Sequence, residues 1–122
     1  MILVDTSVWI DHLHRSDADL VALLERDEVA THALVIEELA LGRIAQRALV
    51  LDMLESLRRL PELDHGELSG LVERWELWGR GLSTVDAHLL GAVLITPGAS
   101  LWSRDRRLLS ACAKVGAPVF SA

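Results

Sequence analysis

The sequence predicts an α/β protein, a three-layer α/β/α arrangement built on a short parallel sheet. Short apolar runs alternate with longer segments of helical periodicity, and the first run, residues 2–5, is apolar up to a closing aspartate. Strands that alternate with helices pair in parallel and are covered by helices on both faces. The 122 residues are expected to form one domain, spanning 1–122.

The first part of the chain contains two expected strands with two expected helices between them. The strands are the short runs at residues 2–5 (ILVD) and 28–32 (EVATH). The helices are expected over residues 7–14 and 17–26, because side chains that can cap a helix precede each of them. These capping candidates are Thr6 or Ser7 for the first helix and Ser16 or Asp17 for the second.

Three helices are expected in the middle of the chain. Residues 33–42 and 44–59 carry apolar residues at helical spacing. Gly42 and Pro61 end these two helices, because glycine favours helix ends and proline cannot continue a helix. Residues 67–79 show the same spacing, with leucine, valine and tryptophan on the apolar face.

The last part of the chain is expected to alternate between helix and strand. A serine or threonine can cap a helix over residues 84–94, and a Pro-Gly turn follows it. A strand over residues 99–103 (ASLWS) and a helix over 105–114 come next. A short strand over residues 117–120 (APVF) completes the predicted sheet.

The composition indicates a soluble globular protein, with 51% apolar and 25% charged residues. No apolar stretch reaches the roughly 18 residues that a membrane-spanning helix needs. Asp5 interrupts the N-terminal apolar run and no basic leader precedes it, so we expect no signal peptide. Cys112 is the one cysteine, which excludes an intrachain disulfide and favours the cytoplasm.

The net charge of −6 argues against a broad electrostatic surface for nucleic acid. It is compatible with an enzyme whose acidic residues hold divalent cations, because a bound metal reverses the local field. Arg104, Arg106 and Arg107 form a basic cluster, and Arg80 lies between two glycines. Phosphate contact is one interpretation of these arginines. We favour the simpler interpretation, that they are solvated surface side chains.

Four acidic residues form the candidate site. Asp5 ends the first expected strand, Asp105 follows the third, and Asp86 lies in the first turn of a helix. Parallel α/β sheets bind their ligands at the carboxyl ends of the strands, so these residues are expected at one edge. Glu38 lies in a helix among apolar neighbours. The adjacent Glu37 is an alternative, and it points about 100° away around the helix.

Carboxylates that converge in this way repel one another. Two unit charges ~5 Å apart cost ~3 kcal/mol at an effective dielectric constant near 20. Several such pairs approach the ~5–15 kcal/mol net stability of a whole domain. A cluster of this kind is expected to hold a cation, and all-oxygen ligands favour Mg²⁺ or Mn²⁺ over Zn²⁺.

Four stretches of the sequence carry a family resemblance. They are ILVDTSVWID with Asp5, VIEELALG with Glu38, LSTVDAHLLGAVL with Asp86, and ASLWSRDRRLL with Ser103 and Asp105. In order and spacing they resemble the four acidic blocks of the PIN-domain family, and the resemblance covers essentially the whole chain. Threonine is the commoner residue at position 103 in that family, and serine also offers a hydroxyl.

The resemblance implies a metal-dependent endoribonuclease, and the compact length is similar to that of VapC-type toxins of bacterial type II toxin–antitoxin pairs. The main ligands of one or two Mg²⁺ or Mn²⁺ ions would be Asp5, Asp86 and Asp105, with Glu38 a further ligand, directly or through water. The residues that would orient these ligands are Thr6, Ser7 and Ser103. The products would carry 5′-phosphate and 3′-hydroxyl ends, because water is the attacking group.

The same resemblance implies three partners: an RNA substrate, a second copy of the chain and an antitoxin protein. The helices over residues 33–60 are the expected docking groove for a helix of the antitoxin. An antitoxin arginine is expected to reach the acidic site, because a guanidinium pairs well with carboxylates. No membrane partner is expected.

Three other interpretations remain open at this point. A PIN-like scaffold that binds partners without catalysis would bind no metal, although all four acids are present. A phospho-acceptor domain would need paired acids at the first strand and a lysine at the last, whereas Thr6 follows Asp5 and Lys114 lies in a helix. A phosphatase with an Asp-x-Asp strand end would need aspartate at position 7, which is Ser7.

Overall fold

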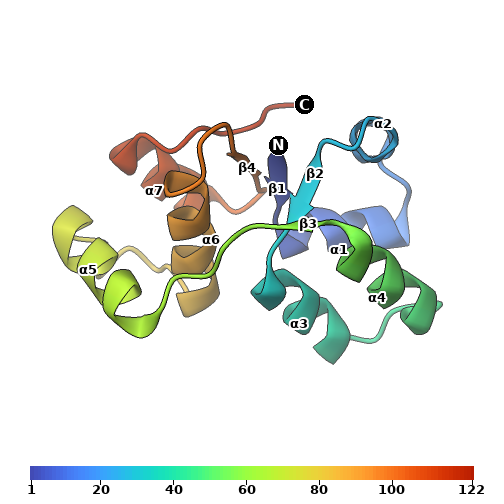
Figure 1. Ribbon diagram of the computed structural model, residues 1–122, viewed down its shortest axis with the longest axis horizontal. Coiled ribbons are helices and arrows are strands. Elements are labelled where there is room, and N and C mark those ends of the chain that lie inside the picture. The colour runs from blue at the N-terminus through green and yellow to red at the C-terminus, as the bar shows by residue number, and fades with distance from the viewer.

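Four short strands form a parallel sheet at the centre of the computed structural model, which describes residues 1–122 (Figure 1). The strands are β1 (Ile2–Val4), β2 (Val29–Thr31), β3 (Arg58–Arg59) and β4 (Ser100–Trp102), in the order β3-β2-β1-β4. All three strand pairs are parallel, and Leu3 of β1 pairs with Ala30 on one side and Leu101 on the other. The predicted α/β class with a short parallel sheet is therefore confirmed.

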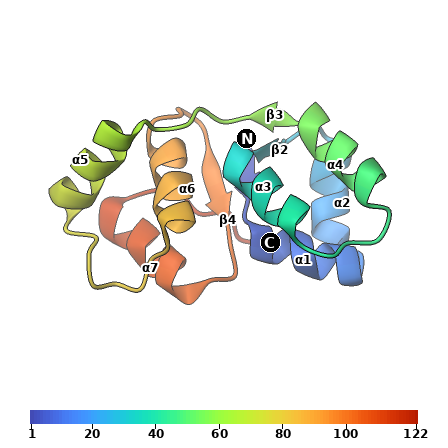
Figure 2. The ribbon, with the colours of Figure 1, turned by 90° about the horizontal axis from the view of Figure 1, so that it is seen from below.

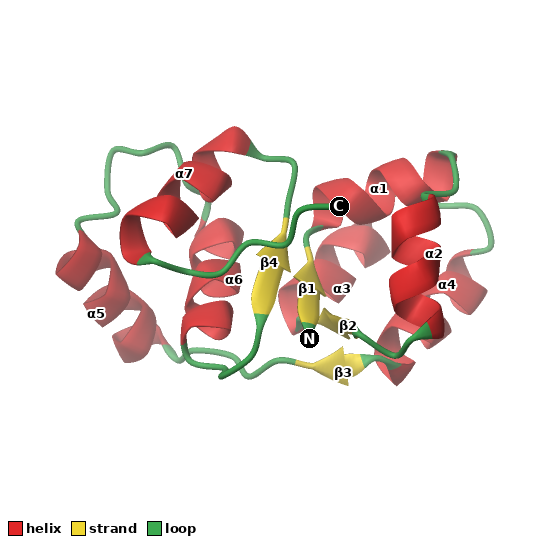
Figure 3. Cartoon of the chain, turned by 90° about the horizontal axis from the view of Figure 1, so that it is seen from above, coloured by secondary structure: helices red, strands yellow, loops and turns green.

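Seven helices flank the sheet in two groups. They are α1 (Thr6–His14), α2 (Ala18–Glu25), α3 (Ala33–Leu41), α4 (Arg47–Ser56), α5 (His65–Trp75), α6 (Thr84–Leu94) and α7 (Arg106–Val115). Figure 2 and Figure 3 show helices α1–α4 on one side of the strands and α5–α7 on the other. This is the predicted three-layer arrangement. No helix is both long and apolar enough to cross a lipid bilayer.

Polar side chains fix where several helices begin. Asp17 caps α2 by accepting hydrogen bonds from Asp19 N and Leu20 N, as its position in the sequence predicts. The cap of α1 is Asp5, which accepts from Thr6 N, so the expectation that Thr6 or Ser7 caps this helix is wrong. Asp5 takes this role because it is the single residue between the end of β1 and the start of α1.

Residues 58–59 form part of the sheet instead of the end of the predicted 44–59 helix. The helix α4 begins at Arg47, after Gln46 in a left-handed conformation with φ of 51°, and ends at Ser56. The next residues pair as β3 with β2, and Leu60 N donates to Thr31 O at 2.9 Å. Leu60 is buried, so the chain gains core packing by leaving the helix there.

Two other predicted elements differ in extent. Residues 117–120 make a single bridge between Val119 and Leu101 and no full strand. Proline at 118 has no N–H to donate, which limits the pairing to its carbonyl and to the N–H of Phe120. Helix α5 ends at Trp75 and not at residue 79, so Trp78 lies in the following loop and is exposed.

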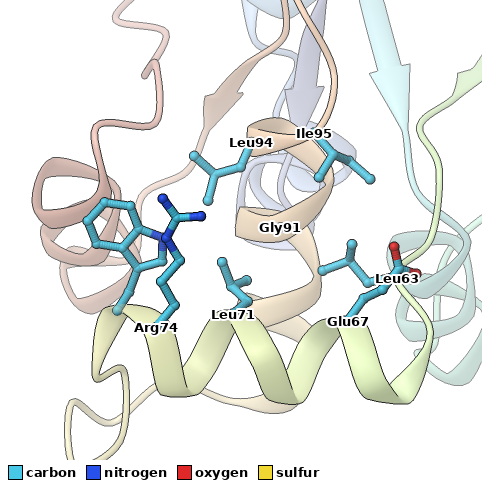
Figure 4. A pocket seen from close by; sticks show the side chains of 8 residues that line it. Leu63, Glu67, Leu71, Arg74, Gly91, Leu94 and Ile95 are labelled. Atoms are coloured by element: carbon cyan, nitrogen blue, oxygen red, sulfur yellow. The ribbon is translucent and has the colours of Figure 1, made fainter.

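One cluster of 27 buried residues makes up the core, with contributions from both groups of helices. Between α5 and α6 the packing is close at Gly91, where an added Cβ would lie 2.2 Å from Leu63 Cδ1. Beside this contact is an open cavity of about 460 Å³. Figure 4 shows Glu67, Leu71 and Arg74 on one wall, from α5, with Leu94 of α6 and the next residue, Ile95, opposite them.

Candidate active site

Asp5 lies at the carboxyl edge of the sheet and is 6% exposed. It directly follows β1, and its N–H donates to Trp102 O of the neighbouring strand β4 at 2.9 Å. Its Oδ1 accepts from Thr6 N and its Oδ2 from Ser103 Oγ, both at 2.7 Å. The side chain is therefore fixed by Thr6, the next residue in the chain, and by Ser103, which follows the adjacent strand β4.

The charge of Asp5 has no cationic partner in the chain. Burial raises the pKa of Asp5, the hydrogen bonds from Ser103 and Thr6 lower it, and the charges of Asp86 and Glu38 raise it. The result is a pKa above the usual 3.8. The ion pairs of the chain all lie elsewhere, at Arg59–Glu55, Arg104–Asp11 and Arg104–Asp17. The fold thus holds a buried acid next to two others, an arrangement that favours a cation.

Glu38 is connected to Asp5 through a threonine. Glu38 lies in the second turn of α3, and its Oε1 accepts a hydrogen bond from Thr6 Oγ1 at 2.7 Å. Thr6 also donates its N–H to Asp5, so one residue contacts both acids. Glu37, also exposed, makes no such contact, which favours Glu38 over its neighbour as the site residue.

Asp86 lies at the amino end of α6. Its N–H donates to Ser83 Oγ and its Oδ2 accepts from Ser83 N, both at 3.1 Å, so the two residues form a capping box. Its charge is close enough to Asp5 to raise the pKa of that residue. The capping box accounts for one carboxylate oxygen, and the structure assigns no bond to the other.

Asp105 and Asp5 share Ser103. The hydroxyl of Ser103, buried at the end of β4, donates to Asp5 and accepts from Asp105 N at 3.0 Å. The Oδ1 of Asp105 caps α7 by accepting from Arg107 N at 2.9 Å. Ser7 makes a longer contact, with its Oγ 3.4 Å from Asp5 Oδ2. The three hydroxyl residues expected to orient the acids therefore all contact at least one of them.

The four acids lie along one edge of the sheet without closing into a single ligand set. No three histidine, cysteine, aspartate or glutamate side chains are close enough together to form a ready-made metal site. The donor chemistry nevertheless suits a hard divalent cation, since every candidate ligand is a carboxylate oxygen. The buried and unpaired charge of Asp5 is the observation that fits such an ion best.

Two features of this edge are not evident from the sequence. Arg104 forms ion pairs with Asp11 of α1 and Asp17 at the start of α2, and its guanidinium lies 5.9 Å from the Trp102 ring centre. Arg104 is exposed, as its interpretation as a solvated side chain expects, and its ion pairs also join the β4–α7 loop to the first two helices. Nothing in the spacing of these residues indicates that they meet.

The second feature is His32, which caps α3. Its Nδ1 accepts from Leu34 N at 3.0 Å, and the residue is fully buried. Serine, threonine, aspartate and asparagine are the usual helix caps, so the residue type gives no indication of this role.

The chain is an α/β/α protein with a short parallel sheet, and acidic residues follow its strands at the carboxyl edge. The comparison with protein families then gives the family: the model of the PIN domain matches residues 2–114. The chain belongs to the PIN-domain family.

Known proteins resemble the chain over nearly its full length. It is 60% identical over 116 residues to two curated proteins called Ribonuclease VapC32, from two strains of Mycobacterium tuberculosis. The match covers 95% of this chain and 94% of each relative. Among solved structures, PAE2754 from Pyrobaculum aerophilum is similar, with a TM-score of 0.59 and 25% identity. That match covers 97% of this chain and 87% of the other.

Proposed function

We propose that this protein is a divalent-metal-dependent endoribonuclease and the toxin of a type II toxin–antitoxin pair. The observation that carries the proposal is Asp5, a buried acid flanked by Glu38 and Asp86 without a cationic partner, in a chain 60% identical to proteins called ribonucleases. A scaffold with no catalytic role would have no need to retain this destabilising group.

The carboxylates supply the ligands for Mg²⁺ or Mn²⁺. Asp5, Asp86 and Asp105 would hold the metal, and Glu38 would do so directly or through water. When bound, such an ion supplies an activated water and stabilises negative charge on the phosphate. Hydrolysis by that water leaves 5′-phosphate and 3′-hydroxyl ends on the RNA.

The hydroxyl residues of the chain orient the acids for this chemistry. Ser103 donates to Asp5 and accepts from the backbone of Asp105, so it fixes the separation of two ligands that follow adjacent strands. Thr6 does the same for Asp5 and Glu38. Because catalytic groups must be held within a fraction of an ångström, each of these contacts contributes to the rate.

The antitoxin docks beside the acids. A groove of about 300 Å³ is lined by α1, α3 and the segment that follows α3, and its lining includes Ile10, Leu13, Leu39, Ile44 and Glu38. An apolar segment of the antitoxin fits this lining, and an arginine next to that segment would reach the acidic edge. The groove lies at the start of the 33–60 region that the sequence indicates, and α1 forms its other wall.

Two further aspects belong to the same proposal. The chain forms a homodimer, and the exposed Trp78 and Ile95 provide apolar surface for it. The protein acts in the cytoplasm, where its RNA substrate is found and where the single buried Cys112 stays reduced.

The proposal is tested with protein purified free of any antitoxin. Total RNA is incubated with the protein in Mg²⁺, in Mn²⁺ and in EDTA, alongside the variants Asp5→Asn and Asp52→Asn. Asp52 is an exposed acid of α4, so its variant is the matched control. We expect discrete cleavage that requires metal, survives in Asp52→Asn and is lost in Asp5→Asn. A folded protein that cleaves no RNA with either metal would instead favour a partner-binding scaffold.

A further inference from the structure

Arg104 lies between two residues of the acidic edge, Ser103 and Asp105. These three residues connect β4 to α7 and form neither helix nor strand, so side-chain contacts have a large part in fixing them. The segment makes side-chain hydrogen bonds to the β1–α1–α2 part of the chain at two residues. Ser103 donates to Asp5, and Arg104 reaches further, to the first two helices.

The guanidinium of Arg104 pairs with one carboxylate from each of two helices. Its Nη1 donates to Oδ2 of Asp11 in α1, and its Nη2 donates to Oδ2 of Asp17, the cap of α2, at 2.8 Å. It also lies 5.9 Å from the ring centre of Trp102, the last residue of β4. Because the two nitrogens are fixed in one plane, the two contacts together define where the side chain lies. We call these two ion pairs the Arg104 clamp.

The two carboxylates of the clamp are themselves held in place. Asp17 caps α2 with its Oδ1, which accepts from the N–H groups of residues 19 and 20, so its Oδ2 is left for Arg104. Asp17 N donates to His12 Nδ1 at 3.0 Å, which ties the start of α2 to α1. Asp11 lies in α1, the helix that Asp5 caps. The clamp therefore joins the segment of Asp105 to the helix that begins at Asp5.

The charges around Arg104 argue against its use as a phosphate contact. One guanidinium between two carboxylates leaves a net negative charge, so an RNA phosphate would have to displace a carboxylate. Arg106 and Arg107 are also exposed and form no ion pair, so they are freer to meet a phosphate. Exposed ion pairs that stand alone contribute little, but Arg104 is shared by two carboxylates, and the Asp17 side chain is only 21% exposed.

We propose that Arg104 is a positioning residue of the metal site, where the Arg104 clamp fixes Asp105 relative to Asp5. Arg104 touches neither metal nor RNA and acts through the backbone of the Ser103–Asp105 segment. Without the clamp, Ser103 alone connects this segment to Asp5, and the two acids lose their fixed separation. The role at the metal site rests on the proposed function, whereas the clamp itself does not.

The positioning role is tested by the affinity for Mn²⁺ in the absence of RNA, measured by isothermal titration calorimetry. Electrostatics alone predicts that removing a cation near the acids tightens Mn²⁺ binding. The clamp predicts the opposite sign: Arg104→Gln should raise the Kd about tenfold, as expected for residues that orient ligands. Arg106→Gln removes the same charge from an exposed side chain without an ion pair, so it is the matched control and should not raise the Kd. Unchanged or tighter binding in folded Arg104→Gln would overturn the proposal.

The clamp itself is tested by urea unfolding, in EDTA, of Arg104→Gln, Asp17→Asn and the double variant. Asparagine keeps an oxygen that can cap α2, so Asp17→Asn removes mainly the ion pair. If the two side chains are coupled, the double variant loses less stability than the sum of the single losses. Arg104→Gln combined with Asp52→Asn, at an exposed acid of α4, is the control cycle and should be additive. Additive losses for Arg104 and Asp17 would refute the clamp.

Cleavage of RNA separates positioning from phosphate contact. Positioning predicts that Arg104→Gln and Asp17→Asn both lower kcat about tenfold, need more Mn²⁺ and keep the KM for RNA. A phosphate contact predicts a higher KM in Arg104→Gln and an unchanged or lower KM in Asp17→Asn, which frees the guanidinium, and this result would overturn the proposal.

The failure of the proposed function can be told apart from the failure of this inference. If the wild type binds Mn²⁺ and cleaves no RNA, the proposed function fails, and the Mn²⁺ affinities still decide the positioning role. If the wild type binds no Mn²⁺, the positioning role fails with the proposed function, and the unfolding cycle still decides the clamp.

Discussion

Replacing Asp5 with asparagine is expected to stabilise the metal-free protein while it abolishes activity. Asp5 is 6% exposed and has no ion pair, and burial, followed by the charges of Asp86 and Glu38, raises its pKa above the usual value. An acid whose pKa is higher in the folded than in the unfolded state destabilises the fold once it is ionised. Asparagine has nearly the same shape without the charge.

The size of the effect follows from two opposing contributions. An uncompensated buried charge costs about 3 kcal/mol. The carboxylate accepts bonds from Ser103 Oγ and Thr6 N on its two oxygens, both at 2.7 Å. Asparagine has one acceptor oxygen and keeps only one of these bonds, which costs roughly 2 kcal/mol. The net gain is about 1 kcal/mol, or about 4 °C in Tm for a domain of this size.

The pH dependence of this gain has a definite sign. Below pH 3.8, the ordinary pKa of this group, Asp5 is protonated in both states and the variant has no advantage. As the pH rises, the unfolded chain loses its proton first, so the wild type loses stability. The loss is complete once the pH exceeds the raised pKa of the folded state, and the gain of the variant is constant above that point.

The assay is scanning calorimetry in EDTA and in Mn²⁺, with Asp52→Asn as the exposed control. Mn²⁺ should raise the Tm of the wild type and of Asp52→Asn and have much less effect on Asp5→Asn, because a ligand stabilises only a state that binds it. A Tm of Asp5→Asn in EDTA below that of the wild type would refute the reasoning. An equal rise with Mn²⁺ in all three proteins would also refute it.

Three further substitutions or probes test other parts of the structure. Ser103→Ala removes the hydroxyl between Asp5 and the backbone of residue 105. It should lower the free energy of unfolding in urea by about 1–2 kcal/mol and the cleavage rate 10–100-fold. Unchanged values would contradict the proposed positioning. Gly91→Ala would place its Cβ 2.2 Å from a leucine carbon and should cost about 1–3 kcal/mol, whereas Gly70→Ala, with nothing within 4 Å, should gain about 0.5–1 kcal/mol; equal shifts would contradict the packing. Cys112 is buried and its pKa is raised to about 11, so its thiol should react with a disulfide reagent at pH 8 only in denaturant; fast reaction of the native protein would contradict this burial.

The main elements and the acidic edge are predictable from the sequence, because few arrangements of strand ends are possible in a parallel sheet. A parallel sheet with helices on both faces brings the carboxyl ends of its strands together, so Asp5 and Asp105 meet once β1 and β4 are placed. This rule does not place Glu38, which lies within a helix and not at the end of a strand. The helical period separates it from Glu37, and only the contact with Thr6 Oγ1 in the folded chain distinguishes the two.

The features that the sequence does not predict depend on contacts between distant segments. Residues 58–59 carry two arginines and no strand pattern, and they enter the sheet because Leu60 is buried and β2 offers a free edge. The ion pairs of Arg104 with Asp11 and Asp17 join residues 93 and 87 positions apart. Such pairings are decided by the tertiary structure, which local propensity and periodicity do not contain.

The measurement that tests the central claim most directly is the single-turnover cleavage rate of one defined RNA, at its mapped site, for Glu38→Gln and Glu37→Gln. The two glutamates are adjacent and exposed, and only Glu38 contacts Thr6 beside Asp5. We predict that the cleavage rate of Glu38→Gln falls by more than the 10–100-fold expected for an orienting residue, and that its residual rate needs more Mn²⁺. We predict that Glu37→Gln cleaves at the rate of the wild type. Equal rates for the two variants, or a larger loss in Glu37→Gln, would contradict the assignment of the carboxyl edge as the catalytic site.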